Sequence, residues 1–291
     1  MRILIFGKQG QVGWELQRSC SVLGMVKSLG SQDVNFLDGK AISQAIRDYQ
    51  PTHIVNAAAY TDVDKAETEE NIASQINGVS VGVLAEEAKV CRAKLVHYST
   101  DYVFDGSKDG AYTEVDAPAP LNAYGRSKLL GEKYIQDVGG ESIIIRVTWL
   151  YGKRGKNFFK TMLRLGQEKE ELRIVSDQVG APTWCRHVSD ATARVISDLD
   201  FGDKTGVYHM TPQGSTSWSG FAEEIFGEVR KIKPSTVLKV KDLVKIRSDE
   251  YPSPARRPRN SLMESRKIEA QFGIKLPHWQ ESLRMVIDDI D

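Results

Sequence analysis

The spacing of Tyr124 and Lys128 is suited to acid–base chemistry. The two residues stand four positions apart at the start of a helical pattern, so they share one face of the expected helix. A free tyrosine has a pKa of about 10, and a nearby ammonium group favours the phenolate and lowers that value. We therefore expect Tyr124 to exchange a proton with a substrate and Lys128 to lower the pKa of Tyr124. Because the same spacing also arises by chance on solvated helices, the pair needs support from other residues.

Thr100 supplies that support. It follows an apolar, β-branched run at residues 94–98 that is expected to be a buried strand. Ligands of open α/β sheets bind outside the carboxyl ends of the strands, which places Thr100 in the expected crevice. Its hydroxyl could donate to the same oxygen that Tyr124 protonates, giving two donors to a developing alkoxide.

A glycine-rich turn follows the first expected strand at once and opens a helix. Such a turn accommodates a dinucleotide: the first glycine allows the tight turn, the second lets backbone approach a pyrophosphate, and the third permits close helix packing. The amides and the dipole of the helix start favour the anion. The residues expected to bind the cofactor here are Gly7, Gly10, Gln11, Val12 and Gly13.

The segment after the second expected strand bears on which dinucleotide binds. An acidic residue ending that strand would bind the ribose 2′-hydroxyl and favour NAD, but no acid occurs there before Asp33. Lys8 could add positive charge beside a 2′-phosphate, so we expect NADPH, with NADH as the alternative. Further cofactor contacts are expected near the adenine and after the small-residue end of the third strand, at Asn35, Phe36, Ala59, Tyr60 and Thr61.

The elements that must position these residues alternate between strands and helices. Strands are expected at residues 3–6, 25–29, 53–56, 94–98 and 142–147, and helices at 11–20, 40–49, 71–89 and 122–136. This alternation predicts an α/β fold: a doubly wound parallel (Rossmann) sheet in residues 1–150, completed by about 172–200. Residues 151–291 are expected to form mainly a smaller C-terminal substrate-binding lobe. A proline- and arginine-rich segment at 251–259 is expected to be a loop.

Composition narrows the classes of partner. Lys plus Arg and Asp plus Glu both number 39 in 291 residues, so no global field would attract nucleic acid or an anionic membrane. No apolar run approaches the roughly 20 residues of a membrane helix. Three widely spaced cysteines fit a reducing compartment. We expect a cytoplasmic protein with a small-molecule substrate.

Taken together, the motifs G-x-x-G-x-x-G, N-A-A-A, S-T-D and Y-x-x-x-K occur here in the order typical of one family. The chain resembles the extended short-chain dehydrogenase/reductases, and within them the reductases of nucleotide-linked 4-keto sugars. The resemblance implies hydride transfer from NADPH to C4, with Tyr124 protonating O4 and Lys128 also holding the nicotinamide ribose. By the same matching, Asp101 lies against the sugar, and Val63 and Trp149 line its pocket.

The diphosphate of such a substrate needs cations. Arg256 and Arg257 in the proline-rich segment could supply them, because guanidinium groups match phosphate oxygens. We name Arg256 as a substrate-binding residue, and the sequence leaves open which of the two points inward. Some relatives are described as magnesium-linked dimers, and Glu15 matches one of the acidic positions involved. The remaining acids are not recognisable, so we predict no metal site, and a homodimer stays open.

Other functions are compatible with the same fold. A dehydratase of this family needs Asp-Glu after the central threonine, whereas Thr100 is followed by Asp101 and Tyr102. An epimerase or another reductase of nucleotide sugars is the nearest alternative. A non-catalytic nucleotide-binding subunit is a third, since the chain also resembles the regulatory β subunit of methionine adenosyltransferase. The intact set of Thr100, Tyr124 and Lys128 favours catalysis.

Overall fold

A parallel six-stranded sheet organises the larger half of the molecule. The structure is a computed structural model that describes residues 1–290. The strand order is β10-β5-β4-β3-β1-β2, and every neighbouring pair is parallel. The strands are β1 (Arg2–Phe6), β2 (Met25–Leu29), β3 (His53–Asn56), β4 (Lys94–Thr100), β5 (Ser142–Val147) and β10 (Gly206–His209).

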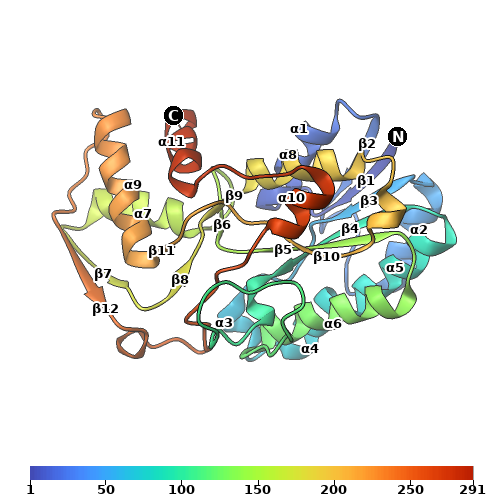
Figure 1. Ribbon diagram of the computed structural model, residues 1–291, viewed down its shortest axis with the longest axis horizontal. Helices are drawn as coiled ribbons and strands as arrows, with labels where there is room; N and C mark the ends of the chain where they lie inside the picture. Colours follow the sequence, from blue (N-terminus) through green and yellow to red (C-terminus); the bar gives the residue numbers. More distant parts are fainter. Residues whose placement is uncertain (291) are drawn as a thin grey trace.

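Helices cover both faces of this sheet (Figure 1). On one face α1 packs against α8, with α10 beside β10; on the other α2, α5 and α6 pack side by side. These helices are α1 (Gln11–Cys20), α2 (Gly39–Tyr49), α5 (Ser80–Val90), α6 (Ala123–Val138), α8 (Cys185–Ile196) and α10 (Arg266–Phe272). Two short helices, α3 (Val63–Ala66) and α4 (Glu70–Ser74), lead through a π-helical turn at Gln75–Val79 into α5.

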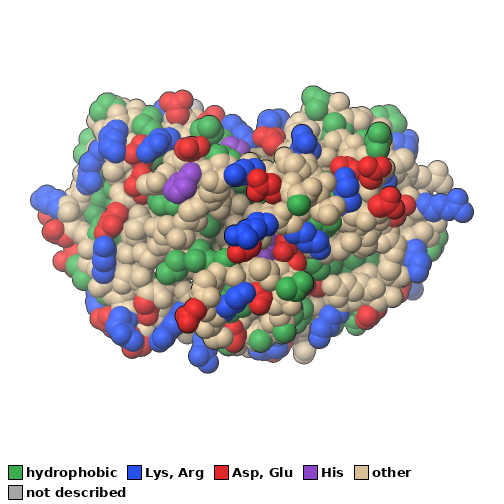
Figure 2. Space-filling model, in the orientation of Figure 1, with side chains coloured by type: hydrophobic (Ala, Val, Ile, Leu, Met, Phe, Trp, Pro, Cys, Tyr) green, Lys and Arg blue, Asp and Glu red, His purple; other side chains and the backbone are tan. Residues whose placement is uncertain are grey.

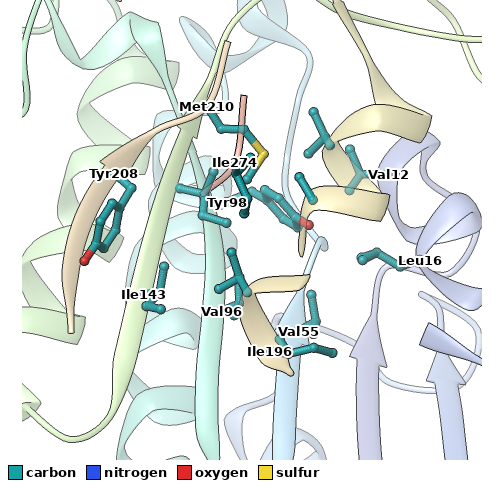
Figure 3. Close-up of a cluster of buried hydrophobic side chains, with 14 of the residues drawn as sticks. Val12, Leu16, Val55, Val96, Tyr98, Ile143, Ile196, Tyr208, Met210 and Ile274 are labelled. Carbon is teal, nitrogen blue, oxygen red and sulfur yellow. The ribbon is translucent and has the colours of Figure 1, made fainter. Parts of the chain in front are cut away.

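The buried side chains explain the two-sided covering. Along β1, Ile3 and Ile5 belong to one core cluster, whereas Leu4 and Phe6 belong to the cluster on the opposite face. Successive residues of a strand point to opposite faces, so a strand that is apolar throughout must be covered twice. Figure 3 shows the cluster on the α1 and α8 side, where Tyr98 and Val96 of β4 lie among residues from both helices.

A smaller lobe carries its own core. Helices α7 (Phe158–Glu168), α9 (Trp218–Ile232) and α11 (Trp279–Asp289) surround a cluster that includes Phe159, Phe221 and Leu283. Beside them β7 (Glu171–Val175) pairs in parallel with β12 (Asp242–Ile246). Two-residue strands complete this part: β6 (Leu150–Tyr151) with β9 (Thr183–Trp184), and β8 (Val179–Gly180) with antiparallel β11 (Thr216–Ser217). In Figure 1, α7, α9, β7 and β12 lie at the end of the molecule away from β1 and β2, with α11, β6 and β9 nearer its middle.

The fold class predicted from sequence is confirmed, with differences of detail. The expected helix at 71–89 is helical throughout but contains the π-helical turn at Gln75–Val79. Segment 172–200 contributes α8 to the Rossmann half, whereas β7 lies in the smaller lobe and the sixth strand, β10, comes later. Residues 251–259 form a loop, as expected.

The surface carries mixed charge. Figure 2 shows acidic and basic side chains interspersed over the visible face, consistent with equal numbers of the two kinds in the sequence. Within residues 1–290, no helix is both long enough and apolar enough to span a membrane.

Candidate active site

Helix α6 brings Tyr124 to the carboxyl end of β4. Asn122 caps the helix by accepting a hydrogen bond from the Gly125 amide at 2.8 Å, and the Glu67 carboxylate accepts one from the Ala123 amide at 2.7 Å. The phenol of Tyr124 lies beside the hydroxyl of Thr100, the last residue of β4, and this neighbour lowers the pKa of the phenol. The structure thus brings the two expected donors together at the end of β4.

The protonation of Tyr124 differs from the sequence-based expectation. Burial raises the pKa of Tyr124 to about 12, the hydroxyl of Thr100 lowers it, and the carboxylate of Asp101 adds to the rise. The expectation that Lys128 lowers this pKa is therefore wrong for this structure, because desolvation outweighs the other influences. A raised pKa keeps the phenol protonated at neutral pH.

Lys128 lies on the same face of α6 and is buried. Its ammonium group donates to the carbonyl of Tyr98 at 2.6 Å and lies 3.2 Å from Nε2 of His97. Burial lowers the pKa of Lys128 to about 8, against a smaller raising effect of Glu132 one turn further along the helix. The lysine is thus held against β4.

Asp101 follows Thr100 directly and is also buried. Its Oδ1 accepts a hydrogen bond from the Thr100 hydroxyl at 3.1 Å. Burial raises the pKa of Asp101 to about 6, while hydroxyl groups of Ser261, Thr100 and Thr148 lower it. A carboxyl group with this pKa can exist in either protonation state near neutral pH.

The glycine turn has the packing expected of a dinucleotide cradle. A Cβ on Gly13 would lie 2.0 Å from the carbonyl oxygen of Gly7, so only glycine lets α1 approach the turn this closely. Gly7 has a φ of +91°, and a Cβ there would lie 2.6 Å from the backbone of Ala57. Gly10 stands at the N-cap of α1, and no side chain among the described residues caps that helix end. Its first amides, at Gln11 and Val12, fit an anionic ligand.

The other expected cofactor residues lie along the same edge. Tyr60 follows Ala59 after β3; its backbone amide donates to Asn77 at 2.8 Å and its phenol to Glu69 at 2.8 Å. Thr61 next to it is exposed. After β2, the Oδ1 of exposed Asn35 accepts from the Leu37 amide at 3.0 Å. The half-buried ring of Phe36 packs edge-on against Phe6 at 5.4 Å between centroids.

Asp33 lies closer to the β2 end than its position in the sequence suggested. Its carboxylate accepts from the Gly30 amide at 2.8 Å and pairs with Lys8 at 2.6 Å. The hydrogen bond with Lys8 is the main reason that the pKa of Asp33 is lowered. An acid and a cation therefore lie together where a ribose 2′ substituent is expected.

A cavity of about 1010 Å³ opens between the two halves. Its walls include Arg256 and Arg257 of the 251–259 loop and Trp218 of α9. Arg257 is tied down, because its Nη2 pairs with Asp64 of α3 at 2.8 Å, next to half-buried Val63. Arg256 is exposed in the cavity wall, and only its backbone carbonyl is held, by Asn122 at 2.8 Å.

Trp149 is not among the residues that line the cavity, but it contacts Trp218, which is. Its ring stacks on Trp218 with the centroids 3.5 Å apart and the planes 9° from parallel. Its backbone has a φ of +44°, a left-handed conformation that non-glycine residues adopt only under constraint. Strain of this kind concentrates at functional sites.

Two polar residues at this site were missed by the sequence reasoning. Asn77 in the π-helical turn is fully buried, and its amide nitrogen donates to the carbonyl of Tyr60 and to Ser127 of α6, each at 2.9 Å. His97 of β4 lies between Asn56 and Lys128. An Asn-Gly pair inside a helical pattern is an unusual signal that could have indicated Asn77. A lone histidine within a strand gave no comparable signal.

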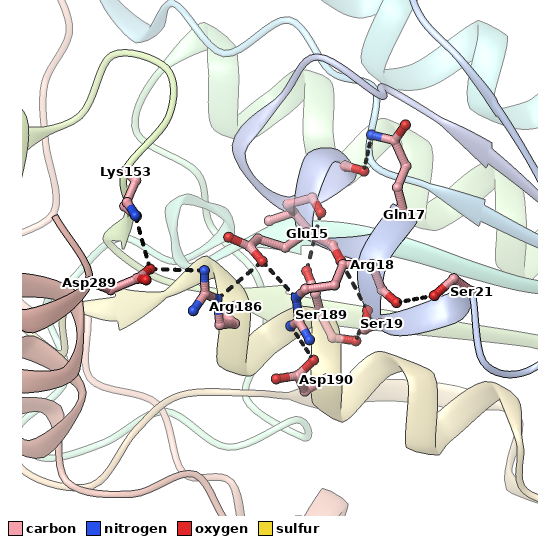
Figure 4. A network of polar contacts seen from close by, with 12 residues as sticks. Glu15, Gln17, Arg18, Ser19, Ser21, Lys153, Arg186, Ser189, Asp190 and Asp289 are labelled. Carbon is pink, nitrogen blue, oxygen red and sulfur yellow. Dashed lines mark hydrogen bonds and ion pairs between the residues drawn. The ribbon is translucent and has the colours of Figure 1, made fainter. Parts of the chain in front are cut away.

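Glu15, considered in connection with metal, lies in a network of ion pairs on the outer side of α1. Its carboxylate pairs with Arg18 at 3.2 Å and with Arg186 of α8 at 3.3 Å, and Arg186 reaches Asp289 of α11 at 2.9 Å (Figure 4). Within residues 1–290, no group of three or more His, Cys, Asp or Glu side chains is placed to hold a metal ion. Arginines surround Glu15 here.

Together these features define a class of protein. A doubly wound parallel sheet, a glycine turn after its first strand, and a tyrosine–lysine pair beside its carboxyl edge characterise Rossmann-fold oxidoreductases of the short-chain dehydrogenase/reductase type.

Comparison with known proteins identifies the particular family. The chain belongs to the family described as the RmlD substrate binding domain, whose model matches residues 1–291. It is 45% identical over 295 residues to the dTDP-4-dehydrorhamnose reductase of Burkholderia thailandensis, covering 100% of this chain and 99% of that protein. It is 42% identical over 295 residues to the enzyme of the same name from Escherichia coli K12, covering 100% and 98%.

Solved structures agree with this assignment. The crystal structure of dTDP-4-dehydrorhamnose reductase from Bacillus anthracis in complex with NADP matches with a TM-score of 0.92 at 33% identity, covering 99% of each chain. The protein of that name from Clostridium acetobutylicum matches with a TM-score of 0.91 at 36% identity, again over 99% of each chain. The resemblance inferred from the four motifs is confirmed.

Proposed function

We propose that this chain reduces dTDP-4-dehydro-L-rhamnose to dTDP-L-rhamnose, with NADPH as the hydride donor to C4. The names of the full-length relatives support the substrate, and the NADP complex of the Bacillus anthracis protein supports the cofactor. The observation that carries the chemistry is the proximity of Thr100 and Tyr124 at the carboxyl edge of the sheet.

The residues of the Rossmann half fit a dinucleotide. The uncapped start of α1 and the close approach of Gly13 to Gly7 leave backbone amides open to a pyrophosphate. Lys8, beside Asp33, can pair with a 2′-phosphate, and Asp33 can accept a ribose hydroxyl when NADH binds instead. The bound nicotinamide supplies the hydride. We assign Lys128 and the segment Ala59, Tyr60 and Thr61 to the nicotinamide end, and Asn35 and Phe36 to the adenine end.

Tyr124 is the proposed proton donor to O4. Its raised pKa keeps the phenol protonated until an alkoxide develops at the substrate oxygen, which is a much stronger base than a ketone. Thr100 supplies a second hydrogen bond to the same oxygen by turning its one hydroxyl hydrogen from Asp101 to the substrate, so the developing charge meets two donors. Asp101, held by Thr100, faces the sugar hydroxyls as an acceptor.

The nucleotide end of the substrate belongs in the cavity between the halves. Arg256 is the proposed diphosphate ligand because its guanidinium is exposed in the wall, whereas Arg257 is paired with Asp64. Trp149, fixed by its stacking on Trp218 and its left-handed backbone, offers an apolar plane to the deoxysugar, with Val63 beside the Asp64 pair.

The direct test is oxidation of NADPH in the presence of dTDP-4-dehydro-L-rhamnose, with the product identified as dTDP-L-rhamnose. Tyr124→Phe should lower kcat by about 10²- to 10⁴-fold, the range of general acid catalysis, while the dissociation constant of NADPH changes little. Tyr134→Phe is the matched control, because this tyrosine lies on the same helix and is 37% exposed. Undiminished turnover in Tyr124→Phe excludes this donor. Binding of NADPH without any turnover would instead indicate a non-catalytic subunit, and epimerised product an epimerase.

A further inference from the structure

His97 forms a buried link between strand β3 and the lysine of α6. In the sheet it pairs in register with Asn56, the last residue of β3. Its Nδ1 lies 3.0 Å from the amide nitrogen of Asn56, and its Nε2 lies 3.2 Å from Nζ of Lys128. The exposed fractions of Asn56, His97 and Lys128 are 1%, 1% and 2%, so each polar atom depends on its protein partner.

The orientation of Asn56 determines which nitrogen of His97 carries the proton. The Asn56 Oδ1 accepts a hydrogen bond from the Ala58 amide at 3.1 Å, so the side-chain nitrogen must point to His97. That nitrogen is a donor only, and the His97 Nδ1 facing it must therefore accept. Burial and the neighbouring lysine lower the pKa of His97 well below its usual range, so the ring is neutral. A neutral ring that accepts at Nδ1 carries its hydrogen at Nε2.

This hydrogen points at Lys128. An ammonium group has three donors and no acceptor, whereas a neutral amine keeps a lone pair. With an ammonium at Lys128, two donors would face each other in a dry environment, which is costly. With a neutral amine, Nζ accepts from His97 while it still donates to the carbonyl of Tyr98.

We propose that His97 is a positioning residue for Lys128: held in its Nε2-protonated tautomer by Asn56, it presents a donor to Nζ and favours release of the lysine proton. The role proposed above for Lys128, holding the nicotinamide end of the cofactor, needs the protonated form, because an ammonium group offers three donors. His97 therefore sets the upper pH limit of the reaction. The effect on the upper pH limit of turnover rests on the proposed function, whereas the tautomer of His97 is a property of the cofactor-free protein.

The charged groups around the link are few. From α6, Glu132 favours the protonated lysine. From β5, Arg146 is bound by Glu132 through two contacts of 2.9 and 2.6 Å, so its charge is largely offset. From β3 and β4 the facing groups are neutral: the amide of Asn56 and the carbonyl of Tyr98. The Nε2 hydrogen of His97 and the carboxylate of Glu132 thus have opposite effects on the protonation of Lys128.

The tautomer can be measured in the cofactor-free protein by ¹⁵N NMR of histidine-labelled protein. His97→Gln identifies the resonances of His97 among the five histidines. The expected result is a hydrogen on Nε2 and an unprotonated Nδ1 at neutral pH. A hydrogen on Nδ1 of the wild-type protein overturns the inference. This experiment involves no turnover, so its failure and the failure of the proposed function are distinguishable.

Asn56→Asp tests the consequence for activity. A carboxylate accepts from both the Ala58 amide and His97, so the ring should carry its hydrogen at Nδ1 and accept from the ammonium of Lys128 at Nε2. The alkaline limb of the kcat profile should move upward by about one pH unit or more, so that one unit above the wild-type limb the variant retains up to about tenfold more of its optimal activity.

His97→Gln is the uncharged counterpart. Its amide can turn an oxygen to the ammonium, so the limb should move in the same direction without any added negative charge. A drop in kcat that is equal at every pH, with the limb unmoved in both variants, would reduce His97 to a packing role and overturn the inference.

Discussion

Two polar networks of the Rossmann half use similar groups under different conditions. One is buried between the sheet and α6, where Lys128 contacts His97 and Arg146 binds Glu132. The other lies on the outer side of α1, α8 and α11, where Arg18, Glu15 and Arg186 exchange ion pairs (Figure 4). The side chains of Arg146 and Glu132 are 4% and 2% exposed, whereas those of Arg18 and its partner Asp190 are 51% and 47% exposed.

The difference shows what burial does to the same chemistry. In the buried network each charge has lost water, so its protonation state depends on the partners that the fold provides. The pKa of Lys128 falls to about 8 there. In the outer network water and salt compete most with the pair of Arg18 and Asp190, and the arginines remain charged with any of their partners. The first network can adjust a reaction, whereas the second only helps hold helices together.

The largest expected effect comes from breaking the buried ion pair. Arg146→Met removes the guanidinium that contacts Glu132 at 2.9 and 2.6 Å and leaves a carboxylate without its charged partner in a dry site. We expect the free energy of unfolding to fall by about 3–5 kcal/mol, measured by urea denaturation.

The double variant Arg146→Met with Glu132→Met is the control. It removes both charges, and replacing a whole buried pair with apolar groups is often neutral or stabilising. We therefore expect it to recover most of the loss. If the double variant is as unstable as Arg146→Met, packing of the arginine stem rather than the unpaired charge explains the effect.

The next largest expected effect comes from replacing Asp101, and it should stabilise the protein, whereas Arg146→Met should destabilise it. Its pKa is about 6 in the folded protein and ordinarily 3.8, so folding disfavours the ionised form. The folded state is therefore relatively most stable below pH about 4, and this contribution is lost as the pH rises through about 6. Asp101→Asn should raise the free energy of unfolding by roughly 2–3 kcal/mol at pH 7.5, with the gain shrinking toward pH 4. Urea denaturation of the variant and the wild-type protein at both pH values tests this prediction. A difference in the free energy of unfolding that does not change with pH would exclude ionisation of Asp101 as the cause.

Such a gain would come with a loss of function under the proposed mechanism, because the carboxylate that destabilises the fold is the one that faces the sugar. The comparison of the two networks predicts that stability rises as activity falls. A charge that contributes to the reaction must be dry, and a dry charge lowers stability unless it is fully paired.

The sequence was informative where periodicity is local. Four of the first five strands, β1, β3, β4 and β5, were placed from short apolar runs, because a strand covered on both faces is mostly apolar. The edge strand β2 has no such run and was placed as a further strand beside them. The sixth strand, β10, was missed, since it has four residues and pairs with β5 from more than 60 positions further along the chain. The two-residue strands of the smaller lobe have no period to detect.

The candidate site divides in the same way. Tyr124 and Thr100 were expected to meet because their positions follow from one helix and one strand end. The predicted direction of the pKa shift of Tyr124 was wrong, because the shift depends on how deeply the whole fold buries the phenol. The pairing of Arg257 with Asp64, 193 positions apart, and the partners of His97 likewise depend on tertiary contacts that one sequence does not reveal.

The smallest expected effect belongs to the outer network. Arg18 pairs with Asp190 at 2.6 Å and joins α1 to α8, but both side chains are about half exposed. We expect Arg18→Gln to change the free energy of unfolding by about 0–1 kcal/mol, and the coupling in a double-mutant cycle with Asp190→Asn to fall as salt rises from low to about 1 M. Because neither residue contacts the sheet edge, the alkaline limb of the kcat profile should stay in place. A coupling as large as that of Arg146 with Glu132, or one insensitive to salt, would mean that exposure does not separate the two networks. Partners on α1 and α8 would then hold the glycine turn in place as firmly as the buried pair holds α6.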